Sequence, residues 1–358
     1  MIQPQGYESE YVNCNLCKKD DTVTLFNGKE RFFKMPGEFR FVRCKHCGLI
    51  YINPRPTRQS MPQYYPAEYP AYNYKEVKPD ELIFLGKEQG SFASLRKWIK
   101  EAILTECYGY TNLYRRKYSR IERFFRKTAV YPFLPRFWRL YFHVVPYVKG
   151  ATLLDVGCGN ASYLLWLKQL GWRVFGVEMD KYCVDFLKSK YNIEVYHGDF
   201  SELVLPQQQF DCINMQHFFE HTYQPLEILE KCWRLLREDG SIVISLPNIG
   251  CLEAAIFKSN WSILDAPRHL YQFSPRTLTA MLKKAGFRVT GIRYQYLTMF
   301  FLNSIENFFQ ARGKQLKFHD KWHHNLFMRF AGMTVSAQQI MFVYARKVPK
   351  KNRVSPWR

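Results

Sequence analysis

The sequence has no long apolar run without polar interruption. The longest candidate, residues 330–345, is broken by Ser336, Gln338 and Gln339, and no stretch reaches the ~18–20 apolar residues that a membrane-spanning helix needs. The first residues, MIQPQGYESEYVN, have neither a basic start nor an apolar core, so no secretory signal is expected. These absences predict a cytoplasmic protein without a transmembrane segment.

The ten cysteines do not follow the pattern of a disulfide-rich secreted domain. Six are scattered through apolar contexts, and four form two C-x-x-C pairs, Cys14 with Cys17 and Cys44 with Cys47. Four thiolates on two short turns predict a closed tetrahedral Zn²⁺ site, with buried or redox-active cysteines as the alternative. Gly48 suits the second turn. A site with four cysteine ligands is structural, so catalysis must lie elsewhere.

Acidic residues are too few to balance the basic ones, and the net charge is +21. The excess lies in residues 81–150, with +9, and residues 311–358, with +10, whereas residues 151–310 carry −1. Such an excess indicates an anionic partner: phospholipid headgroups at the inner membrane face, nucleic acid or a phosphorylated substrate. A basic face that only contacts water is the alternative.

Residues 91–128 show helical spacing in two stripes. The first comprises Phe92, Leu95, Trp98 and Ala102, and the second comprises Tyr114, Tyr118, Ile121 and Phe125. Seven cations surround the second stripe: Arg115, Arg116, Lys117, Arg120, Arg123, Arg126 and Lys127. A basic amphipathic helix of this type suits an anionic membrane surface. It can equally pack its apolar stripe on the next domain and leave its arginines in water.

From residue 151 the chain alternates strand-like and helix-like segments. Strands are expected at ATLLDVG, RVFGVEMD, IEVYHGDF, FDCINMQ and SIVISLPN. This alternation predicts a parallel sheet with helices on both faces. Ligands then bind at the carboxyl ends of the strands.

The loop after the first of these strands, DVGCGNAS, departs from the dinucleotide pattern G-x-G-x-x-G because Ser162 takes the place of the third glycine. Asp155 precedes the first glycine, where a carboxylate suits an ammonium group better than a pyrophosphate. Gly157 and Gly159 let the backbone approach a ligand closely. Cys158 lies between them and is assigned to the same site.

Further acidic residues end the next two strands. Glu178 ends the second, where a carboxylate can accept both ribose hydroxyls. Asp199 ends the third and can accept a hydrogen bond from an adenine amino group, while Phe200 or Met179 covers the ring. Gln216, at the end of the fourth strand, completes the expected cofactor site. These groups fit an adenosine that bears an amino-acid tail and no phosphate.

Several segments resemble class I S-adenosylmethionine-dependent methyltransferases of the branch related to ubiquinone methyltransferases. They are LLDVGCGNASYLLWL, VFGVEMD, GDF, FDCINMQHFFEH, LLREDGSIVISLPN, LKKAGFRV and WSILDAPRHLYQFSPRTL, and the four-cysteine start resembles a zinc-ribbon extension. The resemblance implies an α/β fold, a Rossmann-like seven-stranded methyltransferase sheet with a small N-terminal zinc ribbon and helical insertions. It also implies S-adenosyl-L-methionine as methyl donor, structural Zn²⁺, and QQIMFVYARK as the last strand.

The chain is accordingly divided into four segments. They are a zinc ribbon at 1–60, a Tyr/Pro-rich connector with basic amphipathic helices at 61–145, a methyltransferase domain at 146–348 and a basic tail at 349–358. An insertion at 294–338 separates the last two expected strands. It is interpreted as a lid, a surface-binding element or additional core helices.

The stretch QHFFEH follows the fourth strand and contains H-x-x-E-H, the inverted zinc-protease signature. Pro225 leaves little helix to hold two histidine ligands, so a protease is disfavoured. The resemblance places this loop beside the transferred methyl group. His221, or failing that His217, is therefore expected to be the general base, with His269 as a rival. A histidine that only caps the next helix is the alternative for each.

Some relatives hold a divalent ion in an E-x-x-E-H version of this loop, but His217 replaces the first Glu here. The favoured function is O-methylation of a sugar, glycolipid or other small-molecule hydroxyl, which rests on family analogy. An RNA methyltransferase that grips RNA with its ribbon and basic flanks is the alternative. Against it, the loop reads NMQH instead of N-P-P-Y. A binding module that has lost catalysis is disfavoured because the donor-site residues are intact.

Overall fold

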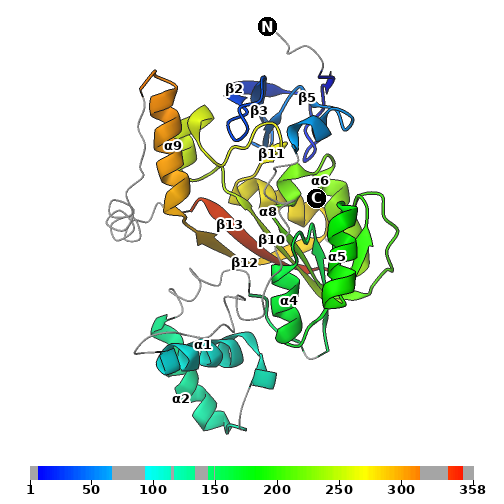
Figure 1. The fold of residues 1–358 in the computed structure, drawn as a ribbon, viewed down its shortest axis with the longest axis vertical. Helices are drawn as coiled ribbons and strands as arrows, with labels where there is room; N and C mark the ends of the chain where they lie inside the picture. Colours follow the sequence, from blue (N-terminus) through cyan, green and yellow to red (C-terminus); the bar gives the residue numbers. More distant parts are fainter. Residues whose placement is uncertain are drawn as a thin grey trace. The chain divides into compact units, whose positions relative to one another are not determined.

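The computed structural model describes residues 7–66, 93–113, 117–133, 144–148, 150–314 and 338–349 (Figure 1). Several predictions fall outside these ranges: most of the Tyr/Pro-rich connector, Tyr114, Arg115 and Arg116, the second half of the insertion, and most of the basic segment 311–358.

A seven-stranded mixed sheet has the strand order β12-β13-β10-β9-β6-β7-β8. Its strands in chain order are β6 (Thr152–Val156), β7 (Arg173–Glu178), β8 (Glu194–His197), β9 (Phe210–Gln216), β10 (Leu236–Pro247), β12 (Phe287–Gln295) and β13 (Ile340–Lys347). β6 pairs in parallel with β7 and β9, and β7 with β8, whereas β12 and β13 are antiparallel. This confirms the predicted fold class and the last strand.

Helices alternate with these strands, as the sequence predicts (Figure 1). They are α4 (Ser162–Gln169), α5 (Lys181–Tyr191), α6 (Pro225–Leu235), α7 (Leu252–Phe257) and α8 (Pro275–Lys284). Local chemistry sets their ends: the Asp180 side chain accepts a hydrogen bond from the Cys183 N–H at the start of α5. Asn192 ends that helix with a left-handed φ of 49°.

The N-terminal ribbon is a four-stranded sheet in the order β11-β4-β3-β2. Its strands are β2 (Thr22–Lys29), β3 (Glu38–Cys44), β4 (Ile50–Ile52) and β11 (Tyr271–Gln272), and β1 (Ser9–Glu10) pairs separately with β5 (Arg55–Pro56). β11 comes from the segment between α7 and α8, because Tyr271 pairs with Tyr51 and Gln272 with Ile50. A later part of the chain therefore completes the ribbon sheet.

Two compact units divide the chain. One contains the described residues of Met1–Tyr69, Gln216–Trp233 and Ile244–Arg358, and the other those of Pro70–Met215 and Arg234–Val243. The first includes the ribbon and the histidine loop, and the second includes the glycine loop and the basic helices.

The basic region forms two helices, α1 (Ala93–Tyr108) and α2 (Arg120–Val130). Gly109 follows α1 with a left-handed φ of 80°, which interrupts the helical run. Ser119 starts α2 through a capping box, in which its side chain accepts from the Glu122 N–H and the Glu122 carboxylate accepts from the Ser119 N–H.

The described part of the insertion forms α9 (Thr298–Gln310). The Ser262 N–H donates a 3.0 Å hydrogen bond to Ser304 Oγ, and Phe257 packs edge-on against Phe301. The insertion therefore contributes an extra packed helix. Within the ranges that the structure describes, no helix is long and apolar enough to cross a membrane.

Candidate active site

The glycine loop after β6 lies in the second compact unit. Gly157 and Gly159 both have left-handed backbones, with φ values of 73° and 50°. A side chain is disfavoured at such φ angles, so conformation requires these two glycines. The buried Cys158 lies between them, and its Sγ is 2.7 Å from the place that a Cβ on Gly176 would occupy. The loop is therefore packed closely against β7.

Asp155, near the end of β6, is a buried carboxyl whose Oδ1 accepts a 2.6 Å hydrogen bond from Asn214 Nδ2. Burial raises the pKa of Asp155 to about 7, although the Asn214 bond opposes that rise. Few nearby groups stabilise the ionised form. A cationic ammonium at this point would lower the pKa again, which is the match expected for an amino-acid tail.

Glu178, at the end of β7, already binds backbone N–H groups. Its Oε2 accepts from Gly159 N–H at 3.0 Å, and its Oε1 accepts from Met179 and Asp180 N–H at 2.8 and 3.2 Å. No local pattern in the sequence predicts this bracing of the glycine loop. The same carboxylate is the predicted partner of the ribose hydroxyls.

The three residues predicted to contact adenine differ in their exposure to solvent. Asp199 is partly buried, and its Oδ1 accepts from the Ser201 N–H and hydroxyl at 2.8 Å. Phe200 is only 1% exposed, so its ring packs in the core and does not cover a ligand as predicted. Met179 is 66% exposed and stays available for that role.

Gln216 ends β9, and its side-chain Nε2 is buried without a hydrogen-bond partner. Buried amide donors are rarely left unpaired in proteins, so this group points to a ligand. Because β6, β7 and β9 are parallel, their carboxyl ends meet at one edge of the sheet. Within the second compact unit, the loop fits S-adenosylmethionine, with Asp155 for the ammonium, Glu178 for the ribose and the two glycines for close approach.

The histidine loop after β9 lies in the first compact unit and centres on Glu220. This residue is 1% exposed, and neither carboxylate oxygen has a hydrogen-bond partner. Its Oε1 lies 3.4 Å from His217 Nδ1 and 3.8 Å from His269 Nε2. Burial alone would raise the pKa of Glu220, but His217, His269 and His221 outweigh it and lower that pKa. Glu220 is therefore ionised among three imidazoles.

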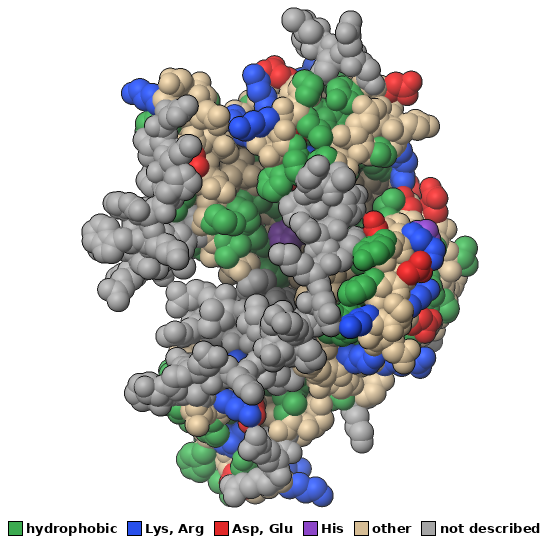
Figure 2. All heavy atoms as spheres, in the orientation of Figure 1, with side chains coloured by type: hydrophobic (Ala, Val, Ile, Leu, Met, Phe, Trp, Pro, Cys, Tyr) green, Lys and Arg blue, Asp and Glu red, His purple; other side chains and the backbone are tan. Residues whose placement is uncertain are grey.

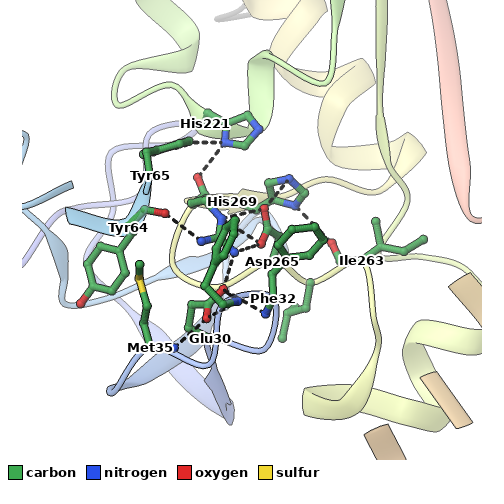
Figure 3. A network of polar contacts seen from close by, with 12 residues as sticks. Glu30, Phe32, Met35, Tyr64, Tyr65, His221, Ile263, Asp265 and His269 are labelled. Atoms are coloured by element: carbon green, nitrogen blue, oxygen red, sulfur yellow. Dashed lines mark hydrogen bonds and ion pairs between the residues drawn. The ribbon is translucent and has the colours of Figure 1, made fainter. Parts of the chain in front are cut away.

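His221 is the best oriented of the three histidines for proton transfer. Its Nδ1 lies 3.1 Å from the Arg268 carbonyl oxygen and 3.0 Å from the Tyr65 hydroxyl (Figure 3). A carbonyl can only accept, so the Arg268 contact places the proton on Nδ1 and leaves the Nε2 lone pair available. Within the described ranges, Nε2 has no recorded hydrogen bond.

Burial, reinforced by His269, lowers the pKa of His221 to about 4, while Glu220 and Asp265 oppose this shift. The imidazole is therefore neutral at physiological pH.

His269, the predicted rival base, is buried, and its Nδ1 donates to the Ile263 carbonyl at 3.2 Å. Its Nε2 faces two carboxylates, Glu220 and Asp265, at 3.8 and 3.7 Å. His269 is thus better placed to orient its neighbours.

His217 is exposed and has a left-handed φ of 49°, and its N–H donates to the Ser245 carbonyl. The structure therefore brings all three predicted histidines around one carboxylate. Glu220, His221 and His269 each offer a ligand atom, and these atoms lie within 4.8 Å of one another. With both Glu220 oxygens unpaired, this set fits a divalent cation.

A buried ion cluster, formed by Glu30, Asp265 and Arg268, ties the ribbon to this loop (Figure 3). Arg268 donates to the Glu30 carboxylate at 2.5 Å, to the Tyr64 carbonyl at 2.8 Å, and to Asp265. The Arg268 and Glu30 side chains are both 0% exposed. This ion cluster, called the Arg268 clasp below, therefore fixes the position of the Arg268 carbonyl. It thereby also orients the His221 ring, which donates to that carbonyl.

The four predicted zinc ligands lie together in the ribbon. The Sγ atoms of Cys14, Cys17, Cys44 and Cys47 are within 4.8 Å of one another. Each turn closes with a backbone hydrogen bond, Lys18 N–H to Cys14 O and Gly48 N–H to Cys44 O. Lys18 and Gly48 both have left-handed φ values, 64° and 80°. The donor set and its geometry fit a structural Zn²⁺.

We expect Cys44→Ser to remove the metal and also to lower turnover, because the ribbon carries Glu30, which holds Arg268. Elemental analysis should find one zinc per wild-type chain and much less in the variant. Cys107→Ser, which changes a cysteine outside the cluster, is the matched control and should keep its zinc. Wild-type protein purified without chelator yet free of zinc would contradict the assignment.

Comparisons with known proteins address the domain as a whole. Residues 124–291 match a family described as a methyltransferase domain. The chain carries a methyltransferase domain. This agrees with the predicted S-adenosylmethionine-dependent class and weighs against the zinc-protease interpretation of H-x-x-E-H.

A Mycolicibacterium smegmatis protein, described as a probable S-adenosylmethionine-dependent methyltransferase, is 27% identical over 141 residues, or 39% of this chain and 53% of that protein. A ubiquinone biosynthesis O-methyltransferase of Coxiella burnetii is 29% identical over 165 residues, or 42% of this chain and 70% of that protein. A solved S-adenosylmethionine-dependent methyltransferase from Archaeoglobus fulgidus is 25% identical, with a TM-score of 0.41, and covers 60% of this chain and 94% of its own. The chain therefore spans about half the length of the mycobacterial relative.

Proposed function

We propose that the protein is an S-adenosylmethionine-dependent methyltransferase that acts on a hydroxyl group of a sugar, glycolipid or other small molecule. The observation that carries the proposal is the neutral, oriented imidazole of His221 on the loop that directly follows β9. The donor-site residues at the ends of β6 and β7 support it. The choice of acceptor class rests on family analogy, including the ubiquinone O-methyltransferase name of one relative.

S-adenosylmethionine supplies a methyl group that is already activated on a positive sulfur. The chain must then mainly position the donor and the acceptor. Asp155 and Glu178 hold the donor by its two polar ends, and Gln216 Nε2 is available to a ligand from the end of β9.

His221 supplies the remaining chemistry. As the acceptor oxygen bonds to the methyl carbon, the carbon–sulfur bond of the donor would break and release S-adenosylhomocysteine, and the hydroxyl proton would pass to His221 Nε2. The resulting imidazolium keeps its Nδ1–H on the Arg268 carbonyl, and ionised Glu220 stabilises its positive charge. A metal held by Glu220, His221 and His269 would instead polarise the acceptor. Chelation experiments separate these two modes.

We expect calorimetry to show binding of S-adenosylhomocysteine and no tight binding of NAD. Glu178→Ala should weaken that binding by roughly 1–3 kcal/mol, because polar groups lose their partner. Glu194→Ala, which removes an exposed carboxylate from β8, is the matched control and should bind as wild type. Tight NAD binding without a response to S-adenosylhomocysteine would contradict the donor assignment.

The acceptor class is tested separately by screening methyl transfer to hydroxylated sugars, glycolipids, quinols and tRNA with radiolabelled donor. We expect transfer to a small-molecule or glycolipid hydroxyl. Transfer to tRNA alone would replace this proposal with the RNA methyltransferase.

A further inference from the structure

The apolar side chains of α2 lie at the surface. Ile121, Phe124 and Phe125 are 71%, 66% and 66% exposed. They occupy positions i, i+3 and i+4, which share one face of a helix. This group is called the α2 ridge below. Figure 2 shows hydrophobic and basic side chains together at the surface where Figure 1 draws α1 and α2.

The opposite side of α2 is packed on α1. Arg123 and Arg126 donate to the two carboxylate oxygens of Glu106 at 3.1 and 3.0 Å, and Glu106 is 2% exposed. Arg126 also lies over the Tyr118 ring, 4.2 Å from its centroid. The arrangement is thus the reverse of a surface helix that buries its apolar stripe. The Arg126 side chain is only 14% exposed against α1, Arg123 is 43% exposed and reaches back to Glu106, and the aromatic residues point outward.

Exposed cations border one side of the α2 ridge. Arg120 and Lys127 are exposed and seven residues apart, so they share a side of the helix next to the ridge. Lys117 is exposed just before the helix. Residues 117–133 carry five basic residues and one acidic residue, a net charge of +4. An apolar ridge bordered by cations complements a surface that is apolar inside and anionic outside.

The loop that joins α1 and α2 is hydrogen-bonded to other parts of the same compact unit. Tyr110, between the two helices, donates to the Val145 carbonyl at 2.8 Å and accepts from Trp172 Nε1 at 3.1 Å. Asn112 Nδ2 donates to the Leu170 carbonyl at 2.8 Å. A folded, anchored helix presents the α2 ridge without the entropy cost of ordering a loose segment.

We propose that α2 docks on an anionic lipid surface, with Ile121, Phe124 and Phe125 entering the headgroup region and Arg120 and Lys127 contacting lipid phosphates. Interfacial helices bind in this way, through buried apolar area and attraction to anionic lipids. A single-stranded nucleic acid is a poorer fit, because it is usually held in a basic groove lined with aromatic rings. The ridge is instead the convex face of a helix and includes the aliphatic Ile121. The proposal does not rest on the methyl-transfer reaction.

The test is flotation of the full-length protein with phosphatidylcholine vesicles, with and without phosphatidylglycerol, at low and high salt. We expect binding only with phosphatidylglycerol, weakened by salt because the Debye length shortens. Phe124→Ser with Phe125→Ser should lower the partition coefficient about tenfold or more, because two aromatic rings lose their burial. Val204→Ser, at a 97% exposed apolar residue, is the matched control.

Charge is tested independently with Arg120→Glu and Lys127→Glu, which should abolish the preference for phosphatidylglycerol. Lys188→Glu, an exposed cation of α5, should leave it unchanged. Because all these side chains are exposed, thermal unfolding should be unaltered. Equal flotation of the serine variant and wild type, or binding of tRNA without binding of vesicles, would overturn the proposal.

Discussion

His221→Ala is expected to lower kcat about 10²–10⁴-fold, the usual contribution of a positioned general base. Affinity for S-adenosylhomocysteine should barely change, because the expected donor contacts lie on Asp155 and Glu178. The measurement is a steady-state rate with the identified acceptor beside calorimetry with S-adenosylhomocysteine. His46→Ala, at a half-exposed ribbon histidine, is the matched control and should retain activity.

The pH dependence has a definite sign. Because the pKa of His221 is lowered to about 4, its imidazole is already neutral at neutral pH. Turnover should therefore stay level as the pH falls from neutral, and decline only as it passes through about 4, where protonation removes the lone pair. A variant that loses donor binding but keeps its rate per bound donor would make His221 structural. Loss of wild-type activity on chelation, with recovery on adding a divalent cation, would make Glu220 and His221 metal ligands.

The same pKa shift affects stability. The unfolded chain holds the histidine at its ordinary pKa of about 6.5 and so binds more protons than the folded chain between that pH and about 4. His221 therefore makes the folded state less stable as the pH falls through this window. In the His221→Ala variant, the free energy of unfolding should therefore fall less steeply as the pH decreases from about 6.5 to about 4.

The sheet could be predicted because strand-like segments rich in apolar residues alternate with helix-like segments from residue 151 on. β6 is buried at all five positions, which accounts for its apolar residues Leu153, Leu154 and Val156. The predicted donor residues rest on a related argument: parallel strands bring their carboxyl ends to one edge of the sheet, so Asp155 and Glu178, which end neighbouring strands, can share a ligand. The four-cysteine cluster could be predicted from the spacing of the two C-x-x-C pairs alone.

Other features depend on contacts that no local pattern encodes. Arg268 and Glu30 are 238 residues apart, and neither residue stands out in its own segment. The pairing of β11 with β4 was missed because two residues make no recognisable strand. Phe200 was assigned to the ligand because it follows Asp199, but its side chain points into the core. Gly109 was the available signal for the break between α1 and α2.

Arg268→Met is expected to cost about 3–5 kcal/mol of stability, because it leaves buried carboxylates without their cation. Glu30 is fully buried, and Asp265 is only partly exposed. Arg268→Lys should recover little, since one ammonium cannot replace a planar guanidinium that reaches Glu30, Asp265 and the Tyr64 carbonyl together. Chemical denaturation of each variant measures this loss.

Adding Glu30→Gln to Arg268→Met replaces one buried, unpaired carboxylate with a neutral amide. The double variant should therefore be more stable than Arg268→Met alone. The difference from additivity gives the strength of the pair. Turnover distinguishes a positioning role from simple stability. If the clasp holds the Arg268 carbonyl against His221, the double variant regains stability while kcat stays low, because the carbonyl is still free to move. Full recovery of kcat along with stability would show that the clasp only stabilises the fold and does not orient the base.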